Sequence, residues 1–285
     1  MIEIIKEGVH CSIQDKGRFG YRHMGVPISG WMDQRSALIS NMILGNREND
    51  AVIEMGPIGL KLVFHVNAYI ALTGAPKKAL LNNEEIQFYK KTWVSSGDVI
   101  NIKSGHLGVW TYLSVCGGIQ TESIWNSRST FHLAGIGKGL IKGVCIPIID
   151  EAISGSSNKL SRIKGNDHLK NSEVKVRKGP EFGHLTLSQQ QSLLDESFTI
   201  GRDSDRMGYY LVPEDKEAFS GTPDIVTSLV GPGTIQLPPS GVAMALMKDC
   251  QTTGGYARVL QIVEEEIDIL SQKRPGEKIK LAFKF

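Results

Sequence analysis

Cysteine is scarce in this sequence, and no metal or redox motif is built from it. The 285 residues include four cysteines, and no two of them form a C-x-x-C pair. So few cysteines exclude a disulfide framework, and without the pair a zinc or redox motif has no support. The seven histidines are scattered without metal-ligand spacing, so no metal site is evident. We expect buried thiols in a cytoplasmic protein.

The chain also lacks a predominant charge and a long apolar run. Its 32 Lys and Arg residues against 30 Asp and Glu residues give a formal net charge of +2. Nucleic acid is therefore not an expected partner, because non-specific phosphate binding needs a broad cationic face. Glu3 and Glu7 stand where a signal peptide would have basic residues. The longest nearly apolar stretch, residues 107–119, is shorter than the about 20 residues that span a bilayer, so no membrane association is expected.

Two cofactor motifs are missing as well. Residues 135–139 have the glycines and the lysine of a P-loop, but neither its spacing nor its Ser or Thr. The pair Met247-Lys248 lacks the second Met of a biotin-attachment turn, because Asp249 follows it. The chain is therefore expected to have no P-loop for ATP and no covalent biotin.

Glycine and short alternating segments are what the chain has in quantity. Glycine accounts for 31 of the 285 residues, above the usual share of about 7%. Apolar and polar residues alternate with the period of a half-buried strand. Strands are expected at residues 60–66, 69–73, 79–81, 99–102, 108–115, 174–176, 225–229, 242–247 and 278–284. Short strands with Gly-rich turns favour a mainly β barrel or sandwich.

Few helices are expected, and all are short. Asp33 is placed to cap a helix over residues 34–44. Ser188, with Gln191 three residues later, has the pattern of a capping box for a second helix. Residues 258–272 fit either one helix or a strand followed by a short helix. We favour the strand and helix, because a glycine pair before this segment is typical of a turn into a sheet.

One polar segment divides the chain. Residues 154–172 are rich in Ser, Asn, Lys and Gly and form either a linker or a long surface loop. The division gives an N-terminal β half over residues 1–153 and a C-terminal β half over residues 173–285. The pattern D-x-x-R-x-G-Y occurs once in each half, beginning at Asp15 and at Asp203. Related corner turns, one site fed from both halves, or coincidence would each explain the recurrence.

Three polar clusters could carry chemistry. The first, residues 14–33, places Arg18 among glycines, which suits a carboxylate or phosphate but also suits a turn pinned by an Asp15–Arg18 salt bridge. The second, residues 127–130, surrounds one guanidinium with three hydroxyls, and an ordinary loop tied by Ser and Thr is the alternative. The third, residues 248–256, follows an apolar strand and combines Asp, Gln, Thr and Gly. A purely structural role rarely requires so many different polar residue types in one loop, so we favour a functional site there.

At these clusters the sequence resembles the family that includes the C subunit of 5-oxoprolinase, the sporulation regulator KipA, the second subunit of allophanate hydrolase and the carboxyltransferase region of urea carboxylase. The resembling motifs are collinear from residue 12 to residue 276. They are S-I-Q-D-x-G-R-x-G-Y from residue 12, G-V-P-x-S-G-x-M-D from 25, N-x-x-L-G-N from 41, L-T-G-A from 72, S-R-S-T from 127, S-D-R-M-G from 204, G-x-I-Q-x-P-x-x-G from 233, D-x-Q-T-T-G-G-Y from 249 and Q-x-x-P-G from 272.

The resemblance implies a mainly β fold with a cyclophilin-like β-barrel architecture, in two associated halves that form one family domain. It also implies a functional site. The implied catalytic residues are Asp249, Arg128 and Asp15, and the implied substrate-binding residues are Arg18, Asp33, Ser129, Asp205, Arg206, Gln251, Thr252 and Tyr256. The sequence departs from the family at Asn126, where Gly is usual, near Gly143, where a Gly-Asp is usual, and at Ala257, where Pro is usual.

For function, the resemblance implies a protein that does not act alone. We expect the C subunit of an ATP-dependent 5-oxoprolinase, which opens 5-oxoproline to glutamate with a KipI-like partner of the B type and a metabolite-binding partner of the A type. ATP would be used at the level of the complex, and the arginines would hold a small anionic substrate. Two alternatives stay open: a KipA-like regulator that antagonises a histidine-kinase inhibitor, and the carboxyltransferase component of a urea carboxylase or allophanate-type system.

Overall fold

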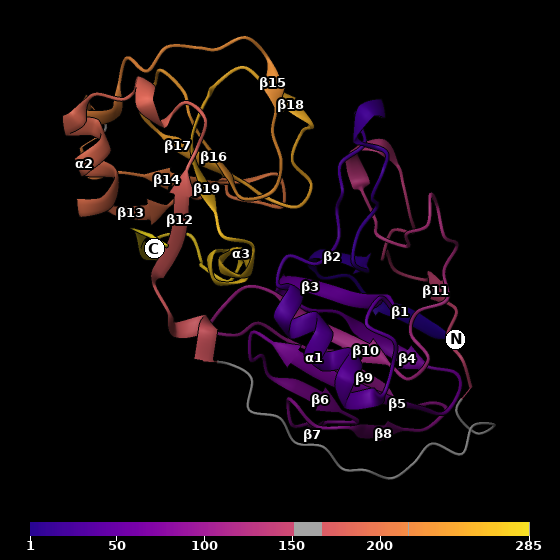
Figure 1. The fold of residues 1–285 in the computed structure, drawn as a ribbon. Helices are drawn as coiled ribbons and strands as arrows, with labels where there is room; N and C mark the ends of the chain where they lie inside the picture. Colours follow the sequence, from indigo (N-terminus) through magenta and orange to yellow (C-terminus); the bar gives the residue numbers. More distant parts are fainter. Residues whose placement is uncertain (151–166, 216, 285) are drawn as a thin grey trace. The chain divides into compact units, whose positions relative to one another are not determined.

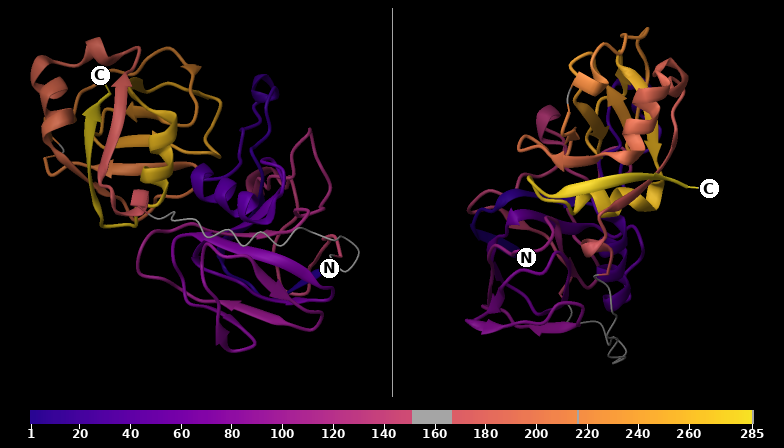
Figure 2. Two further views of the ribbon diagram at one scale, coloured as in Figure 1. Left: turned by 60° about the horizontal axis from the view of Figure 1, so that its bottom comes forward. Right: turned by 90° about the vertical axis from the view of Figure 1, so that its left-hand side faces the viewer.

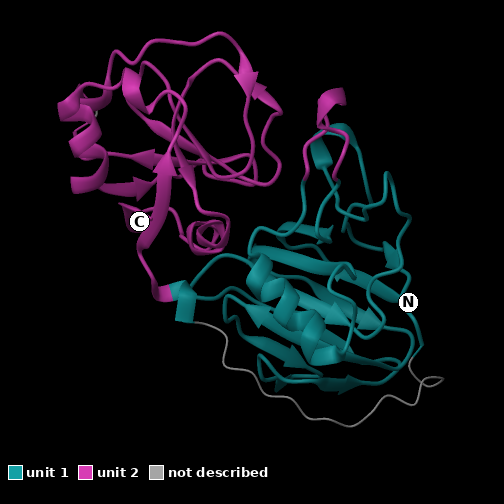
Figure 3. Cartoon of the chain, viewed as in Figure 1, with its two compact units in different colours: residues 1–18, 29–169 teal, residues 19–28, 170–285 magenta. Residues whose placement is uncertain are grey.

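The computed structural model describes residues 1–150, 167–215 and 217–284, which form a mainly β structure with three α-helices (Figure 1). The chain folds into two compact units (Figure 3). Unit 1 comprises residues 1–18 and 29–169, and unit 2 comprises residues 19–28 and 170–285. No helix among the described residues is both long enough and apolar enough to cross a membrane. The mainly β prediction is confirmed.

Unit 1 contains two antiparallel sheets. The first has the order β11-β1-β4-β9-β6-β7 and the second the order β2-β3-β10-β5-β8. The first sheet comprises β1 (Ile2–Lys6), β4 (Lys61–Phe64), β6 (Ala79–Leu81), β7 (Glu84–Glu85), β9 (Val99–Ile102) and β11 (Cys145–Ile146). The second comprises β2 (Val9–Gln14), β3 (Val52–Ile58), β5 (Ala68–Gly74), β8 (Thr92–Val94) and β10 (Thr111–Val115). Alternating apolar side chains of both sheets form one core, to which Leu60, Leu62 and Phe64 belong.

Helix α1 (Gln34–Leu44) packs on β5 and β10 of the second sheet (Figure 1). Its start is confirmed, because Asp33 is the N-cap and its Oδ1 accepts a hydrogen bond from Ser36 N at 2.9 Å. The helix ends at Gly45, whose φ of 73° lies in the left-handed region that glycine adopts without strain.

Unit 2 is built on a closed barrel with the order β12-β19-β16-β17-β14-β13-β20, seen from two further sides in Figure 2. Its strands are β12 (Glu173–Lys178), β13 (Ser197–Ile200), β14 (Gly208–Val212), β16 (Thr234–Leu237), β17 (Ala243–Leu246), β19 (Ala257–Ile262) and β20 (Lys278–Phe283). The barrel closes through a parallel pairing of β12 with β20, and the other neighbouring strands are antiparallel. A small separate sheet pairs β15 (Ser228–Leu229) with β18 (Thr253–Gly254).

Short helices complete the described chain. Unit 2 contains α2 (Leu187–Asp195) and α3 (Glu264–Ser271). The 3-10 helices are η1 (Arg22–Met24), η2 (His132–Ala134), η4 (Asp167–Lys170), η5 (Phe182–His184) and η6 (Glu217–Phe219). The strand and helix expected over residues 258–272 are confirmed by β19 and α3. Of the segment 154–172, residues 154–166 lie outside the described residues.

Two sequence predictions in unit 2 are wrong. The strand expected at residues 225–229 covers only Ser228–Leu229, because these are the residues that pair with β18. The capping box of α2 is made by Thr186 and Gln189, not by Ser188 and Gln191. Thr186 has extended backbone and its hydroxyl accepts from Gln189 N at 3.2 Å, whereas Ser188 already lies inside the helix.

Replacing Thr186 with Ala is expected to lower the free energy of unfolding by about 1 kcal/mol, the usual cost of losing an N-cap side chain. Ser188→Ala is the matched control, since the Ser188 side chain does not cap the helix. Chemical denaturation monitored by circular dichroism measures both. Equal losses in the two variants would contradict the assignment of the cap.

Candidate functional site

Asp15 brings the first and second polar clusters together within unit 1. Its carboxylate is buried. Oδ1 accepts hydrogen bonds from Ser127 Oγ at 2.7 Å and Ser129 Oγ at 2.6 Å. It also accepts from Gly17 N at 2.9 Å, while Oδ2 accepts from Arg128 N at 2.6 Å. Four donors thus converge on one carboxylate, which fixes the loop of residues 127–129 beside the end of β2.

Two arginines add hydrogen bonds near the contact between Asp15 and the loop of residues 127–129. Arg18 is fully buried, and its guanidinium donates to Ile124 O at 3.1 Å and Ser129 O at 2.7 Å. Arg128 is half-buried, and its Nε donates to Thr121 O at 2.8 Å. Backbone carbonyls are therefore partners of both side chains, and the bond from Arg18 to Ser129 O ties the first polar cluster to the second.

A tight turn precedes the Ser127–Thr130 run. Trp125 and Asn126 have φ values of 52° and 61°, and Ile124 pairs with Ser127 across them. Positive φ at both central residues is typical of a hairpin turn that favours Asn or Gly. Asn126, which departs from the usual glycine of the family, is therefore among the residues best able to keep this backbone.

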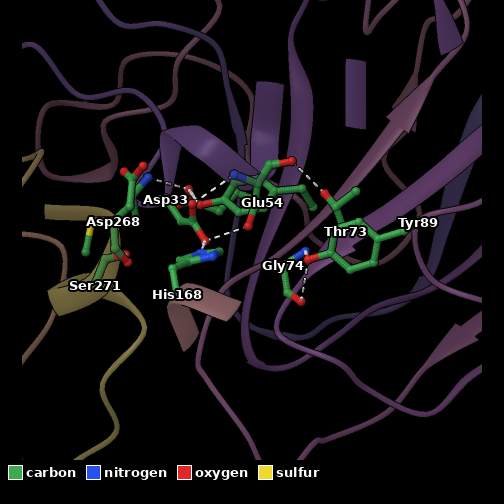
Figure 4. Close-up of polar contacts among 11 residues, drawn as sticks. Asp33, Glu54, Thr73, Gly74, Tyr89, His168, Asp268 and Ser271 are labelled. Atoms are coloured by element: carbon green, nitrogen blue, oxygen red, sulfur yellow. Dashed lines mark hydrogen bonds and ion pairs between the residues drawn. The ribbon is translucent and has the colours of Figure 1, made fainter. Parts of the chain in front are cut away.

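A second polar network in unit 1 surrounds Asp33 (Figure 4). His168 Nε2 lies 2.8 Å from Asp33 Oδ2, and Ser36 Oγ donates to the same oxygen at 2.6 Å. Burial alone would raise the pKa of Asp33, but the hydrogen bond and charge of His168 and the hydrogen bonds from Ser36 outweigh this effect and hold the pKa below its ordinary value. His168 belongs to η4, so this pair joins residues far apart in the sequence.

The network continues through buried groups of the second sheet. Asp33 N donates to Tyr112 Oη at 2.7 Å, and Tyr112 Oη donates to Glu54 Oε2 at 2.8 Å. Burial and the neighbouring Glu54 carboxylate raise the pKa of Tyr112 well above its ordinary value, so the phenol stays protonated. The network also reaches helix α1, because Thr73 Oγ1 donates to Ser36 O at 2.7 Å.

Sequence reasoning identified Asp33 in this network but missed His168, Glu54 and Tyr112. Glu54 could have been found from the sequence, because a carboxylate within the largely apolar strand of residues 52–58 needs a buried partner. His168 gave no such signal, because it lies within the polar segment of residues 154–172 and has no motif around it.

In unit 2 the third cluster is organised by an ion pair. Arg206 Nε lies 2.7 Å from Asp249 Oδ2, and Arg206 Nη2 lies 3.0 Å from Asp249 Oδ1. Asp249 N also donates to Arg206 O at 2.8 Å. A bidentate pair of this kind is strong and directional. Asp249 therefore has both carboxylate oxygens engaged, and its role in proton transfer stays a prediction.

The remaining polar residues of this cluster support one another. Gln251 Nε2 donates to Gln236 Oε1 at 3.3 Å, and Gln236 Nε2 donates to Tyr256 O at 3.2 Å. Arg22 donates to Thr252 O at 3.4 Å and also to Val230 O. Arg22, from η1, was not among the predicted site residues.

The two copies of the D-x-x-R-x-G-Y pattern differ in their contacts. Asp15 is buried, whereas Asp203 is exposed. In the second copy it is Asp205 whose Oδ1 accepts from Met207 N at 2.7 Å and Gly208 N at 3.3 Å. The shared letters therefore do not produce equivalent hydrogen bonds.

The predicted site residues are thus distributed over the two units. Unit 1 holds Asp15, Arg18, Asp33, Arg128 and Ser129, and unit 2 holds Asp205, Arg206, Asp249, Gln251, Thr252 and Tyr256. Within the described part of the chain, no group of three or more His, Cys, Asp and Glu residues is arranged to hold a metal ion. The roles assigned to these residues stay predictions.

Known proteins with similar sequences agree with the resemblance noted above. Residues 24–283 match the family described as carboxyltransferase domain, subdomain A and B. The chain is 30% identical to the C subunit of 5-oxoprolinase from Haemophilus influenzae, over 98% of this chain and 90% of that protein. It is 29% identical to the C subunit of 5-oxoprolinase from Escherichia coli with the same coverage. It is also 30% identical to urea amidolyase of Saccharomyces cerevisiae, over 98% of this chain but 16% of that protein.

Solved structures share the fold. The crystal structure of TTHA0988 superposes with a TM-score of 0.88 at 25% identity, and the Kluyveromyces lactis urea carboxylase with a TM-score of 0.85 at 25% identity. The match covers 99% and 98% of this chain, but only 55% and 27% of those chains. Since sequence and fold agree over nearly every residue, this chain belongs to the carboxyltransferase-domain family of subdomains A and B.

Proposed function

We propose that this chain is the C subunit of an ATP-dependent 5-oxoprolinase, which opens 5-oxoproline to glutamate. The observation that carries the proposal is coverage: the chain matches 90% of the 5-oxoprolinase C subunit of Haemophilus influenzae, against 16% of the yeast urea amidolyase. A relative matched almost end to end is the better guide to what a chain does. Its name also marks it as one of several subunits, which supports the need for partner proteins.

The proposed partners are a KipI-like protein of the B type and a metabolite-binding protein of the A type. The lactam is stable, so its opening at neutral pH is coupled to ATP, which can activate the ring by transferring a phosphoryl group to the carbonyl oxygen with loss of ADP. Water then adds to the activated carbon, the C–N bond breaks with the nitrogen leaving as the amine, and phosphate is released. This sequence has no P-loop, which fits ATP binding elsewhere in the complex. The chain would then contribute anion binding and orientation.

Among this chain's residues, Arg128 is the proposed contact for the substrate or acyl-phosphate anion. Its Nε is fixed on Thr121 O, so the guanidinium has a set direction. Asp15 would act by positioning, since it binds Arg128 N and the Ser129 hydroxyl. Asp249 is the proposed proton-transfer group, held in orientation by Arg206.

The test is reconstitution of this chain with its two partners, 5-oxoproline and ATP, with glutamate as the measured product. The wild-type complex should produce glutamate. Replacing both Arg128 and Asp249 with Ala should lower the rate at least about 100-fold, the scale of a lost proton-transfer group alone. The control replaces Arg47 and Asp203, both exposed, with Ala, and circular dichroism verifies folding. Undiminished glutamate formation by the Arg128/Asp249 variant would refute the site assignment.

The urea amidolyase relative and the urea carboxylase structure favour one second candidate, carboxyl transfer from carboxybiotin on a protein in trans. Avidin separates the two functions, because it blocks biotin chemistry and leaves lactam opening untouched. If glutamate formation by the reconstituted complex survives excess avidin, the carboxyltransferase alternative is excluded.

A further inference from the structure

A fully buried glutamine of unit 2, Gln236, supports the third polar cluster. It belongs to β16, in which all four residues are buried. A buried amide destabilises a fold unless its polar atoms are hydrogen-bonded. The two side-chain hydrogen bonds of Gln236 to described residues both go to the loop of residues 251–256, and neither goes to another strand of the barrel. The amide therefore serves this loop.

The strand and the loop are both shaped around this side chain. The register between β16 and β19 shifts between Ile235 and Gln236. An irregularity of this kind changes the direction of nearby side chains and is common beside functional sites. On the loop, a Cβ on Gly254 would lie 2.7 Å from Gln236 Nε2. A side chain at residue 254 would therefore displace the amide, and glycine lets the loop approach it closely.

The hydrogen bonds fix which way two glutamine amides face. Tyr256 O is a carbonyl oxygen and can only accept, so the Gln236 group that faces it at 3.2 Å is the NH₂. The Gln236 oxygen then faces Gln251, and only the NH₂ group of Gln251 can donate to it, at 3.3 Å. The Tyr256 carbonyl thus sets the orientation of the Gln251 amide through Gln236.

Gln251 Oε1 is the atom that these bonds leave available. It accepts no hydrogen bond from any residue that the structure describes. Gln251 is half-buried, and this oxygen is not among the described side-chain atoms that are both buried and unpaired, so it keeps surface that a ligand can reach. An amide oxygen only accepts hydrogen bonds. The ligand group that meets it is therefore an N–H or O–H donor.

We propose that Gln236 is a positioning residue that holds Gln251 Oε1 ready to accept from the substrate, an inference that rests on the proposed function. Without Gln236 the Gln251 amide is free to rotate and to present its NH₂ group instead. With its carboxylate ionised, 5-oxoproline has one hydrogen-bond donor, the ring N–H. The fixed oxygen of Gln251 accepts from this group.

Nuclear magnetic resonance of the full chain tests the positioning without an enzymatic assay. In the wild-type chain the side-chain NH₂ of Gln251 should be ordered, and Gln236→Met should lower its order parameter below about 0.6. The effect runs in one direction: Gln251→Met should leave the Gln236 NH₂ ordered, because its bond to Tyr256 O remains. A mobile Gln251 amide in the wild type, or one that stays ordered in Gln236→Met, overturns the proposal.

The kinetics of the reconstituted complex give a readout that a purely structural role would not move. Gln236→Met should raise the KM for 5-oxoproline about tenfold and leave kcat nearly unchanged, because the lost hydrogen bond contributes to substrate binding. Gln251→Met should do the same. The double variant should be no worse than either single variant, because both residues act through one hydrogen bond. An additive rise of about 100-fold would contradict the proposal.

Gln261→Met is the matched control. Gln261 of β19 also supports a turn, since its Nε2 donates to Pro232 O at 3.1 Å and its Oε1 accepts from Thr234 Oγ1 at 3.0 Å. None of these three is a predicted site residue. This variant should lose about as much thermal stability as Gln236→Met and keep the wild-type KM. Equal rises of KM in the two variants would show that Gln236 has a structural role alone.

Two of these results do not require Gln236→Met to fold. They are the order of the Gln251 amide in the wild-type chain and the rise of KM in Gln251→Met, and the absence of either overturns the proposal.

The same experiments separate this proposal from the proposed function. If the complex forms glutamate and Gln236→Met leaves KM unchanged, the positioning role fails and the function stands. If the complex forms no glutamate while the Gln251 amide is ordered in the wild type and freed in Gln236→Met, the function fails and the positioning of Gln251 stands.

Discussion

Asp15→Asn is expected to lower the free energy of unfolding of unit 1 by about 3–4 kcal/mol. The carboxylate accepts three hydrogen bonds on Oδ1 and one on Oδ2. An amide has one oxygen, so its NH₂ group must face at least one of those donors and leave it unpaired in a buried position. Denaturation with urea, followed by near-UV circular dichroism, measures the loss.

The matched control is Asp203→Asn, in the second copy of the same sequence pattern. Asp203 is exposed, so the same chemical change should alter stability by less than about 0.5 kcal/mol. Similar losses in the two variants would show that Asp15 does not hold the loop of residues 127–129. A folded Asp15→Asn protein should also form glutamate more slowly in the proposed complex, because the loop of Arg128 would lose part of its contact with the carboxylate.

His168→Ala is expected to lower the free energy of unfolding by about 3–5 kcal/mol near neutral pH, because the buried Asp33 carboxylate loses a hydrogen-bonding partner. Asp33 is fully buried and relies on His168 Nε2 at 2.8 Å as well as on Ser36. The loss should be seen in the midpoint of chemical denaturation. His132→Gln, at an exposed histidine of η2 in the same unit, should have little effect.

The cost of His168→Ala should depend on pH in a defined direction. The folded-state pKa of Asp33 lies below its ordinary value of 3.8. The carboxylate therefore contributes stability above that ordinary value, and the contribution is lost as the pH falls through the lowered folded-state pKa. The difference between wild type and variant should thus be full near neutral pH and shrink below about pH 4. A difference that grows on acidification would contradict the pairing.

Much of the fold could be predicted because its signals are local. Asp33 and Gly45 delimit α1 by cap chemistry within a few residues, and the alternation of Leu60, Leu62 and Phe64 reports one buried face. The capping box of α2 was misplaced by two residues because Thr186 and Ser188 offer the same chemistry. Which of the two caps the helix depends on where extended backbone gives way to helix, and this occurs at Thr186.

The candidate site could be predicted in composition but not in arrangement. Asp15 and the Ser127–Thr130 run were both identified, yet only the fold shows that four donors of two clusters meet on one carboxylate. The alternative of an Asp15–Arg18 salt bridge did not include the bonds of Arg18 to Ile124 O and Ser129 O. Side-chain types cannot predict which backbone carbonyls will accept hydrogen bonds, because every residue has one.

The class of fold, the family and the residue types at the candidate site can all be inferred from the sequence alone. These follow from short-range rules, such as strand periodicity and cap chemistry, and from ordered motifs that span nearly the whole chain. The sequence does not show that Asp33 pairs with His168, that Arg206 binds Asp249, or that the Tyr112 hydroxyl donates to Glu54. Each of these is a contact between residues far apart in the chain, and such contacts form only when strands have paired and their loops have packed.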